Sequence, residues 1–207
     1  MKLQVAFDVK SYSHLQKIMK DIHRHIDILE VGTLLLKSEG VDTIKKAKKE
    51  FGLPVFADLK CMDAGKFEVQ IAADAGADYI TILGASYENN IKEFIDECKK
   101  SNVKSVVDSI NCPNDKILRT QDMGIDIIEL HTGYMNKVGS RPWDDIEQIY
   151  NKARVPIFMS GGMGSANLKE MEKFKPKIDT VVVGRAIVYS DNPKEEAKKI
   201  REILDSF

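Results

Sequence analysis

The sequence lacks the features that would tie it to a membrane or a nucleic acid. No apolar run reaches the roughly 20 residues that a membrane-spanning helix needs, and Asp8 interrupts the apolar start of the chain too early for a signal peptide. Lys and Arg number 31 against 32 Asp and Glu, so no basic surplus attracts nucleic acid or anionic lipid. We therefore expect neither a nucleic acid nor a membrane as a partner.

The chain also lacks a cysteine pattern. Its three cysteines, Cys61, Cys98 and Cys112, are far apart and form no CxxC pair. An odd number without regular spacing argues against a disulfide framework and against a zinc site built from cysteines. It fits a reducing compartment, so we expect a soluble cytoplasmic protein.

What the chain does have is eight short runs rich in Val, Ile and Leu. These runs are almost continuously apolar, which is typical of strands in a parallel sheet that is covered on both faces. Between them, residues 13–22, 91–100 and 193–204 carry apolar side chains at three- and four-residue spacing, which predicts amphipathic helices. The expected strands are residues 3–8, 26–32, 54–60, 78–84, 103–109, 125–132, 155–162 and 179–185.

The alternation of strands and helices predicts an α/β protein. No linker or low-complexity tract interrupts the series, so we expect one domain over residues 1–207. Eight strand–helix units favour a closed (β/α)8 barrel, the TIM barrel, at the compact end of its size range. The alternative is an open doubly wound sheet, which normally shows a glycine fingerprint after its first strand. Residues 6–14 contain no glycine, and the barrel is therefore favoured.

Polar residues follow the apolar run of most of these strands. Catalytic groups of TIM barrels gather at the C-terminal ends of the strands, and buried charges must be paired or bound to a metal. We therefore expect the polar residues to converge on one site. They are Asp8, Glu30, Asp58, Lys60, Asp108, His131, Ser160, Gly161, Gly162, Gly184 and Arg185.

Several of these residues, and one nearby acid, also have a structural interpretation. Asp8 could cap the helix that follows it, and Asp58 and Lys60, two apart on one strand face, could form an ion pair. Asp63 could be an acid in a first helical turn. His131 could be a buried core histidine, but the glycine soon after it indicates a loop at the rim, and we favour catalysis.

Glycines after the last two expected strands indicate a phosphate site. Loops after strands 7 and 8 of TIM barrels commonly bind phosphate through backbone N–H groups. Gly161, Gly162 and Gly184 give the backbone that freedom, and Arg185 can add a bidentate contact. The alternative is that the glycines serve only tight turns. We favour a phosphorylated substrate.

Glu30 and Asp58 provide two carboxylates from neighbouring strands. Mg²⁺ is commonly held by one or two carboxylates together with waters and substrate oxygens. We expect Mg²⁺ here, where it can stabilise an enediolate with Lys60 as a second positive charge.

The order of these motifs resembles the orotidine 5′-phosphate decarboxylase suprafamily. The motif Asp58-x-Lys60-x-x-Asp63 follows LEVGT (29–33) and precedes HTGY (131–134), and the similarity spans the whole chain. The resemblance implies a homodimeric barrel that binds Mg²⁺ and a sugar phosphate.

The resemblance also implies a role for each residue. Glu30 and Asp58 would be the metal ligands, and Lys60 would stabilise the enediolate. His131 would be the acid–base residue, and Asp63 would reach into the site of the partner subunit. Gly162, Gly184 and Arg185 would hold the phosphate, with Asp8 nearby.

Two branches of this suprafamily share the enediolate: 3-hexulose-6-phosphate synthases and 3-keto-L-gulonate-6-phosphate decarboxylases. Asp108 and Tyr134 stand where the decarboxylases typically have glutamate and arginine, so the chain looks like a synthase, with Asp108 among its catalytic residues. Arg185 is more usual in the decarboxylases, and Met135 stands where synthases often have an acid. We therefore expect aldol condensation of formaldehyde with ribulose 5-phosphate, with the decarboxylase and a non-catalytic sugar-phosphate-binding barrel as alternatives.

Overall fold

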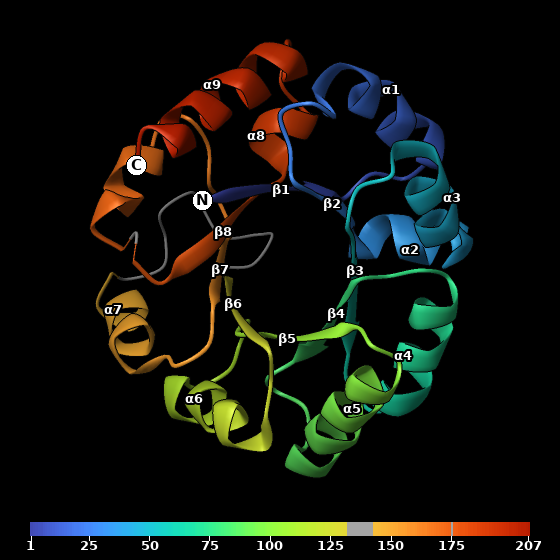
Figure 1. Ribbon diagram of the computed structural model, residues 1–207, viewed down its shortest axis with the longest axis vertical. Coiled ribbons are helices and arrows are strands. Elements are labelled where there is room, and N and C mark those ends of the chain that lie inside the picture. The colour runs from blue at the N-terminus through green and yellow to red at the C-terminus, as the bar shows by residue number, and fades with distance from the viewer. Residues whose placement is uncertain (132–142, 175) are drawn as a thin grey trace.

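Eight strands pair in chain order and close into a parallel barrel in the computed structural model (Figure 1). The structure describes residues 1–131, 143–174 and 176–207. The elements are β1 (Lys2–Phe7), α1 (Tyr12–Ile22), β2 (Ile28–Val31), α2 (Thr33–Glu39), α3 (Asp42–Phe51), β3 (Val55–Cys61), α4 (Gly65–Asp74), β4 (Tyr79–Leu83), α5 (Glu88–Lys100), β5 (Lys104–Asp108), α6 (Asn114–Met123), β6 (Ile127–His131), α7 (Trp143–Lys152), β7 (Ile157–Ser160), the 3-10 helix η1 (Leu168–Phe174), β8 (Ile178–Val183), α8 (Arg185–Val188) and α9 (Pro193–Asp205).

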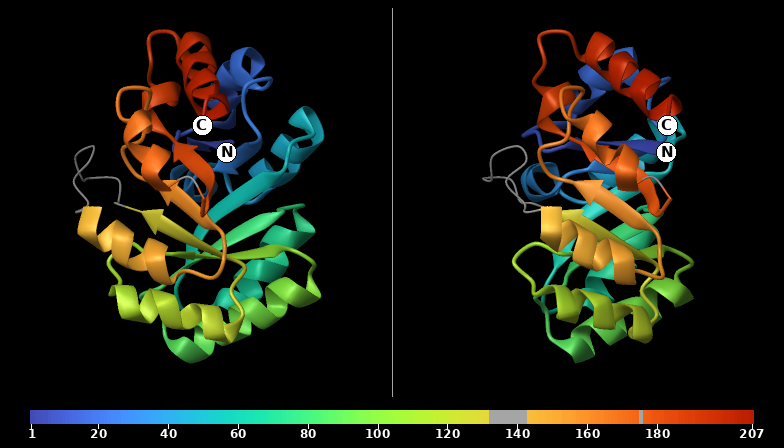
Figure 2. Two further views of the ribbon diagram at one scale, coloured as in Figure 1. Left: turned by 60° about the vertical axis from the view of Figure 1, so that its left-hand side comes forward. Right: turned by 90° about the vertical axis from the view of Figure 1, so that its left-hand side faces the viewer.

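The closed barrel confirms the predicted (β/α)8 fold. Each of the eight expected strands is present, although β2 is shorter than predicted and β7 ends at Ser160, before the two glycines. Figures 1 and 2 show helices around the outside of the barrel. Strands in this position are buried on both faces, which explains why their sequences are continuously apolar. None of the described helices is long and apolar enough to cross a membrane.

The outer face of the barrel packs against the helices. Each amphipathic helix turns its apolar stripe inward, as α1 does with Leu15, Ile18, Met19 and Ile22. The last helix, α9, packs against the first, α1, and Pro193 stands in its first turn, where a missing N–H costs no helical hydrogen bond.

The barrel interior is filled by side chains at every second position of the strands. Phe56, Tyr79 and Phe158 lie there with ring centroids 6.0–6.3 Å apart, together with smaller apolar residues of the same cluster. Two positions further along the strands, and therefore on the same face, the interior becomes polar: Asp58 follows Phe56, and Ser160 follows Phe158. The polar end of the barrel thus lies directly above the layer formed by Phe56, Tyr79 and Phe158, which we call the aromatic floor.

This floor leads to a prediction for stability. Phe158→Ala should lower the free energy of unfolding by about 3–5 kcal/mol, because it leaves a cavity among rings that cannot close it. Tyr87 is 81% exposed, and Tyr87→Ala should change stability by no more than about 0.5 kcal/mol. Urea unfolding followed by circular dichroism measures both, and equal losses would contradict a packed interior.

Candidate active site

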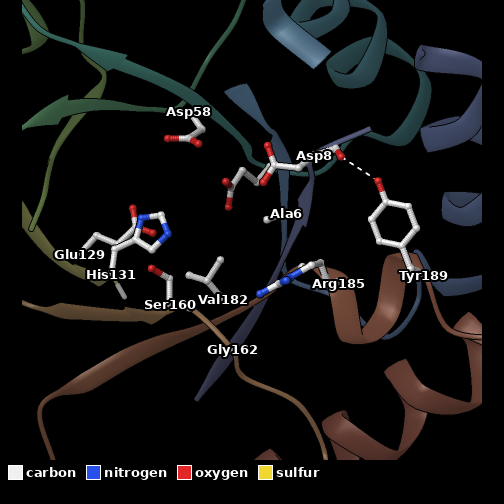
Figure 3. Close-up of a pocket in the computed structure, with 13 residues that line it drawn as sticks. Ala6, Asp8, Asp58, Glu129, His131, Ser160, Gly162, Val182, Arg185 and Tyr189 are labelled. Atoms are coloured by element: carbon white, nitrogen blue, oxygen red, sulfur yellow. Dashed lines mark hydrogen bonds between the residues drawn. The ribbon is translucent and has the colours of Figure 1, made fainter. Parts of the chain in front are cut away.

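A pocket opens at the C-terminal end of the barrel, above the aromatic floor (Figure 3). It brings together most of the residues that the sequence pattern singled out, from six different strands or the turns that follow them. The pocket is lined by Ala6, Asp8, Glu30, Asp58, Glu129, His131, Ser160, Gly161, Gly162, Val182, Gly184, Arg185 and Tyr189.

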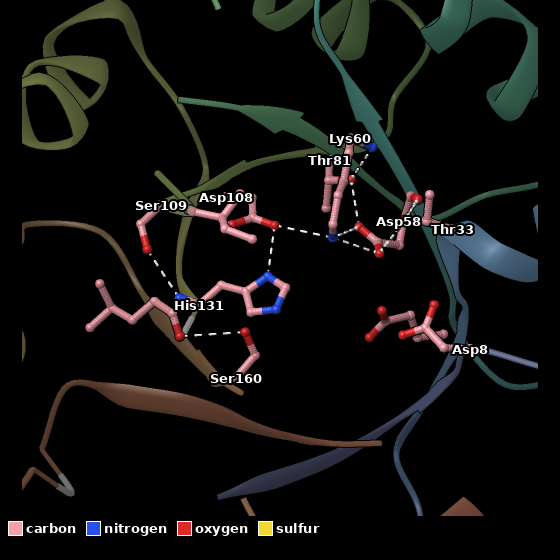
Figure 4. Close-up of polar contacts among 12 residues, drawn as sticks. Asp8, Thr33, Asp58, Lys60, Thr81, Asp108, Ser109, His131 and Ser160 are labelled. Atoms are coloured by element: carbon pink, nitrogen blue, oxygen red, sulfur yellow. Dashed lines mark hydrogen bonds and ion pairs between the residues drawn. The ribbon is translucent and has the colours of Figure 1, made fainter. Parts of the chain in front are cut away.

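Lys60 and Asp108 stand beside the pocket and join its charged residues into one array (Figure 4). The Lys60 ammonium lies 2.7 Å from both carboxylate oxygens of Asp58 and 3.1 Å from Oδ2 of Asp108. The same Asp108 oxygen lies 2.9 Å from Nδ1 of His131. The ion pair between Asp58 and Lys60, the structural alternative for this motif, is therefore present, and it is part of a longer chain of contacts.

The backbone at Lys60 is in the left-handed region, with φ at 49°. Side chains other than glycine rarely adopt this conformation, and it costs free energy. It arises at an irregularity in the pairing of β3 with β4. Ala57 pairs with Ile80, and Cys61, four residues later, pairs with Ile82, which is only two residues later on β4. The Lys60 N–H then donates to Oγ1 of Thr81 at 2.9 Å. The irregularity turns the ammonium back toward Asp58 and Asp108.

Hydroxyl groups hold Asp58 in place. Thr33 donates to its Oδ2 at 2.7 Å, and Thr81 donates to its Oδ1 at 3.1 Å. Thr33 follows Gly32 at the start of α2, so this contact comes from the turn after β2. A carboxylate with this many partners keeps one orientation.

The charged array sets the protonation of its members. Burial alone would lower the pKa of Lys60, but the carboxylates of Asp58 and Asp108 outweigh burial and raise it. Burial would raise the pKa of Asp108, but the contacts with His131 and Lys60 lower it to about 2. Lys60 is therefore cationic and Asp108 anionic at neutral pH.

His131 is oriented for proton transfer. Burial would lower its pKa, but the hydrogen bond and charge of Asp108 raise it above 6.5. Because Asp108 is ionised and only accepts, Nδ1 of His131 carries the proton of their shared hydrogen bond. Nε2 is thus the ring nitrogen that can exchange a proton with a bound molecule, because the ring lines the pocket (Figure 3).

Glu30 is buried on β2, where its Oε2 accepts a hydrogen bond of 2.6 Å from Nε2 of Gln4. Burial and then the charges of Asp58, Glu129 and Asp8 raise its pKa well above the ordinary value. A cation between Glu30 and Asp58 would remove this repulsion. The two carboxylates suit Mg²⁺, which needs few protein ligands. Within the described residues, no group of three or more His, Cys, Asp or Glu side chains forms a metal cluster.

Asp8 follows the end of β1 and contacts two distant parts of the chain. Its Oδ1 accepts a long hydrogen bond of 3.4 Å from the N–H of Leu34 in the first turn of α2. It does not cap α1, the helix that follows it, which begins after Ser11. Its backbone oxygen accepts 3.0 Å from the Tyr189 hydroxyl. Burial and the nearby Asp58 raise the pKa of its carboxyl.

Two consecutive left-handed glycines follow Ser160. Gly161 has φ at 92° and Gly162 at 69°, values that other residues rarely adopt. The Gly162 carbonyl accepts 3.0 Å from the Asn167 amide, which holds the turn closed. Gly184 and Arg185 face this turn from the end of β8, and the Arg185 side chain points into the pocket (Figure 3). This side of the pocket can receive an anion.

Asp63 lies apart from the other predicted site residues. It is exposed between β3 and α4 and does not line the pocket of its own chain. Tyr134 and Met135, which bear on the branch of the suprafamily, lie outside the described residues.

Comparisons with known proteins agree over the full length of the chain. A sequence model of the Orotidine 5'-phosphate decarboxylase / HUMPS family matches residues 1–200. The 3-hexulose-6-phosphate synthase of Bacillus subtilis (strain 168) is 34% identical over 99% of both chains. The 3-hexulose-6-phosphate synthase 2 of Staphylococcus saprophyticus is 31% identical, over 100% of this chain and 98% of the relative.

The chain belongs to the orotidine 5′-phosphate decarboxylase / HUMPS family. The crystal structure of 3-hexulose-6-phosphate synthase from Salmonella typhimurium has a TM-score of 0.92 and 34% identity, and the match covers 100% of this chain and 99% of that chain. The crystal structure of KGPDC from Streptococcus mutans has a TM-score of 0.87 at 21% identity, covering 99% of this chain and 97% of that chain, and shares the fold.

Among the described residues around the site, sequence patterns missed Gln4, Thr33, Thr81, Glu129 and Tyr189. The sequence pattern points to the residue at which each strand ends, whereas Gln4, Thr81 and Glu129 lie within strands, Thr33 begins a helix and Tyr189 follows α8. Glu129 could have been found, because a carboxylate between apolar residues in the stretch 127–130 is as conspicuous as Glu30. The threonines carry no such signal, since their role depends on where Asp58 lies.

The contact between Asp108 and His131 predicts a change in titration. Asp108→Asn removes a negative charge and the ionised acceptor, so the pKa of His131 should fall. The raised pKa of the wild-type protein means that this pair stabilises the fold fully below the unfolded value of about 6.5, and that the stabilisation is lost as pH rises through the folded value. In the variant that pH dependence should shrink.

NMR titration of the histidine ring protons measures this change, and His131→Gln identifies the signal. Asp115→Asn serves as the control, since this exposed acid on α6 pairs with Arg119 instead. An unchanged His131 pKa in Asp108→Asn would show that the contact does not control the titration.

Proposed function

We propose that this chain is a 3-hexulose-6-phosphate synthase, which condenses formaldehyde with ribulose 5-phosphate. The observation that carries the proposal is the array from Asp58 through Lys60 and Asp108 to His131, in which a cation and a base face one pocket. The full-length similarity to proteins named 3-hexulose-6-phosphate synthase supports it.

The two sides of the pocket suit the two ends of the substrate. The phosphate would bind beside Gly161, Gly162 and Gly184, with Arg185 providing charge-assisted contacts. The carbonyl end would then point toward His131 and Lys60, across the pocket (Figures 3 and 4).

His131 would take a proton from C1 of ribulose 5-phosphate at Nε2, and Asp108 would stabilise the imidazolium that results. The electron pair of the broken C–H bond delocalises onto the carbonyl oxygen and forms the enediolate. Lys60 would stabilise its negative charge, because the ammonium is already fixed nearby. The enediolate carbon then attacks formaldehyde, whose oxygen gains a proton.

Glu30 and Asp58 would hold Mg²⁺. When bound, the ion supplies positive charge for the oxygens on adjacent carbons of the substrate. The Lys60 ammonium, which contacts both Asp58 and Asp108, would add a second positive charge at the same end of the substrate.

We further propose that the chain acts as a homodimer in the cytoplasm, with Asp63 completing the site of the partner subunit. Phe67 and Ile71 are 64% and 52% exposed on one face of α4, and Met62 is exposed next to Asp63. Apolar residues gathered in this way are typical of an interface. Cys61, Cys98 and Cys112 are free thiols, as suits a reducing compartment.

The reaction can be tested directly. Purified protein with Mg²⁺, ribulose 5-phosphate and formaldehyde should consume formaldehyde, and chelation of Mg²⁺ should stop consumption. Lys60→Ala should lower the rate by at least about 100-fold, because the charge that stabilises the enediolate is lost. Lys45→Ala, an exposed lysine on α3, should not change it. Thermal melting checks that Lys60→Ala folds.

A parallel reaction with 3-keto-L-gulonate 6-phosphate distinguishes the branches, because Arg185 is the one described feature that favours the decarboxylase. Release of CO₂ without formaldehyde consumption would replace the synthase with the decarboxylase. If neither reaction occurs while the sugar phosphates still raise the melting temperature, the barrel binds without catalysing.

The role of Asp63 predicts complementation between two inactive variants. Asp63→Ala and His131→Ala should each be inactive alone. A mixed dimer of the two contains one site with both residues intact, provided that Asp63 acts across the interface. Random pairing during co-expression should therefore restore about a quarter of the wild-type activity. If Asp63 acts within its own chain, no site is intact and the mixture stays inactive.

A further inference from the structure

Glu129 is a charged residue inside the pocket to which the proposed mechanism gives no role. It lies in the middle of β6, two positions before His131 and on the same face of the strand. It lines the pocket and is only 3% exposed. Its Oε2 has no hydrogen-bond partner within the described part of the chain.

The surroundings of Glu129 make this arrangement unfavourable for structure alone. Ile127 precedes it on the same strand face, and Phe158 is its register partner on β7; both belong to the apolar cluster inside the barrel. On its other side it pairs in register with Asp108 on β5. A buried carboxyl oxygen without a partner lowers stability, and a functional pocket is where such groups concentrate.

Glu129 and Glu30 enter the barrel interior from opposite sides, because Glu129 belongs to β6 and Glu30 to β2 of the eight-stranded barrel. Burial, and after it the charge of Asp108, raises the pKa of Glu129 to about 7. Burial thus favours the neutral form of this carboxyl, and a neutral carboxyl can donate a proton.

We propose that Glu129 is the general acid that protonates the oxygen of formaldehyde as the new carbon–carbon bond forms. The geometry that supports this role is a buried, unpartnered carboxyl oxygen in the pocket that also holds His131. The inference rests on the proposed function, since it assigns the second proton transfer of that reaction.

The step balances in atoms and electrons. The enediolate carbon donates an electron pair to the formaldehyde carbon, and the electrons of the C=O π bond move to its oxygen. That oxygen takes the proton of the Glu129 carboxyl and becomes the hydroxyl of the product. The proton that His131 removed from C1 then returns Glu129 to its neutral form, directly or through water.

Separate measurement of the two proton transfers tests this role. Exchange of the C1 hydrogens of ribulose 5-phosphate in D₂O, followed by NMR, needs the base and not the acid. Formaldehyde consumption needs both. In Glu129→Gln, which keeps the size of the side chain but cannot release a proton, we expect condensation to fall about 100-fold more than exchange.

Two further variants sharpen the test. Glu129→Asp keeps an acid on a shorter side chain and should recover part of the condensation. Glu97→Gln replaces another largely buried glutamate, on α5 and bonded to Gln70, and should leave both rates unchanged. Because exchange and condensation are measured on one sample, their ratio does not depend on how much of a variant folds.

The results separate this inference from the proposed function. If wild-type protein fails to consume formaldehyde, the proposed function is wrong. If wild-type protein condenses formaldehyde and Glu129→Gln lowers exchange and condensation by the same factor, or lowers neither, Glu129 is not the acid. A His131→Gln variant should lose both rates, which marks the difference between the base and the acid.

Discussion

The site depends on one partly buried ammonium, that of Lys60. Lys60 lies between Asp58 and Asp108, and without it two carboxylates would face each other inside the barrel. Removal of one partner from such a buried group is strongly destabilising, because the remaining charges are left without compensation. The left-handed backbone at Lys60 shows that β3 accepts local strain to place the ammonium there. His131 depends on it as well, since Lys60 helps to keep Asp108 ionised and Asp108 orients the imidazole.

The barrel makes this concentration of charge possible by separating it from the core. Alternate strand positions bring Phe56, Tyr79 and Phe158 together in the interior, and the same faces become polar further along the strands. Packing in the aromatic layer is independent of what the rim binds. Burial above that layer is the main reason that the pKa values of Glu30 and Glu129 rise, and the charges of neighbouring carboxylates add to the rise. The same low dielectric strengthens the contacts with His131 and Lys60 that lower the pKa of Asp108.

The sequence was sufficient for the fold and for the location of the site, because both follow from local patterns. Continuous apolar runs predict covered strands, and a polar residue at the end of such a run predicts the rim, as for Asp8 and His131. Contacts between neighbouring strands are harder to predict from the sequence. The irregularity of β3 at Lys60 cannot be seen in the sequence of β3, since it is defined by the pairing with β4. Glu129 was missed because it lies inside a strand rather than at its end, and Asp63, whose proposed role involves a second subunit, lies away from the pocket of its own chain.

The distribution of charge indicates how the pocket can accept an anionic substrate at all. Five carboxyls, those of Asp8, Glu30, Asp58, Asp108 and Glu129, gather near the pocket, and a phosphate placed among them would be repelled. The glycine turn after β7 and Arg185 after β8 form the part of the pocket to which no strand adds a carboxylate, because β7 and β8 contribute none to the lining residues. Under the proposed function, a sugar phosphate would be oriented by repulsion as much as by attraction. Its phosphate would lie beside Arg185, and its uncharged carbonyl end would enter the acidic side, where Lys60 and a cation held by Glu30 and Asp58 would stabilise the negative charge only when the reaction creates it.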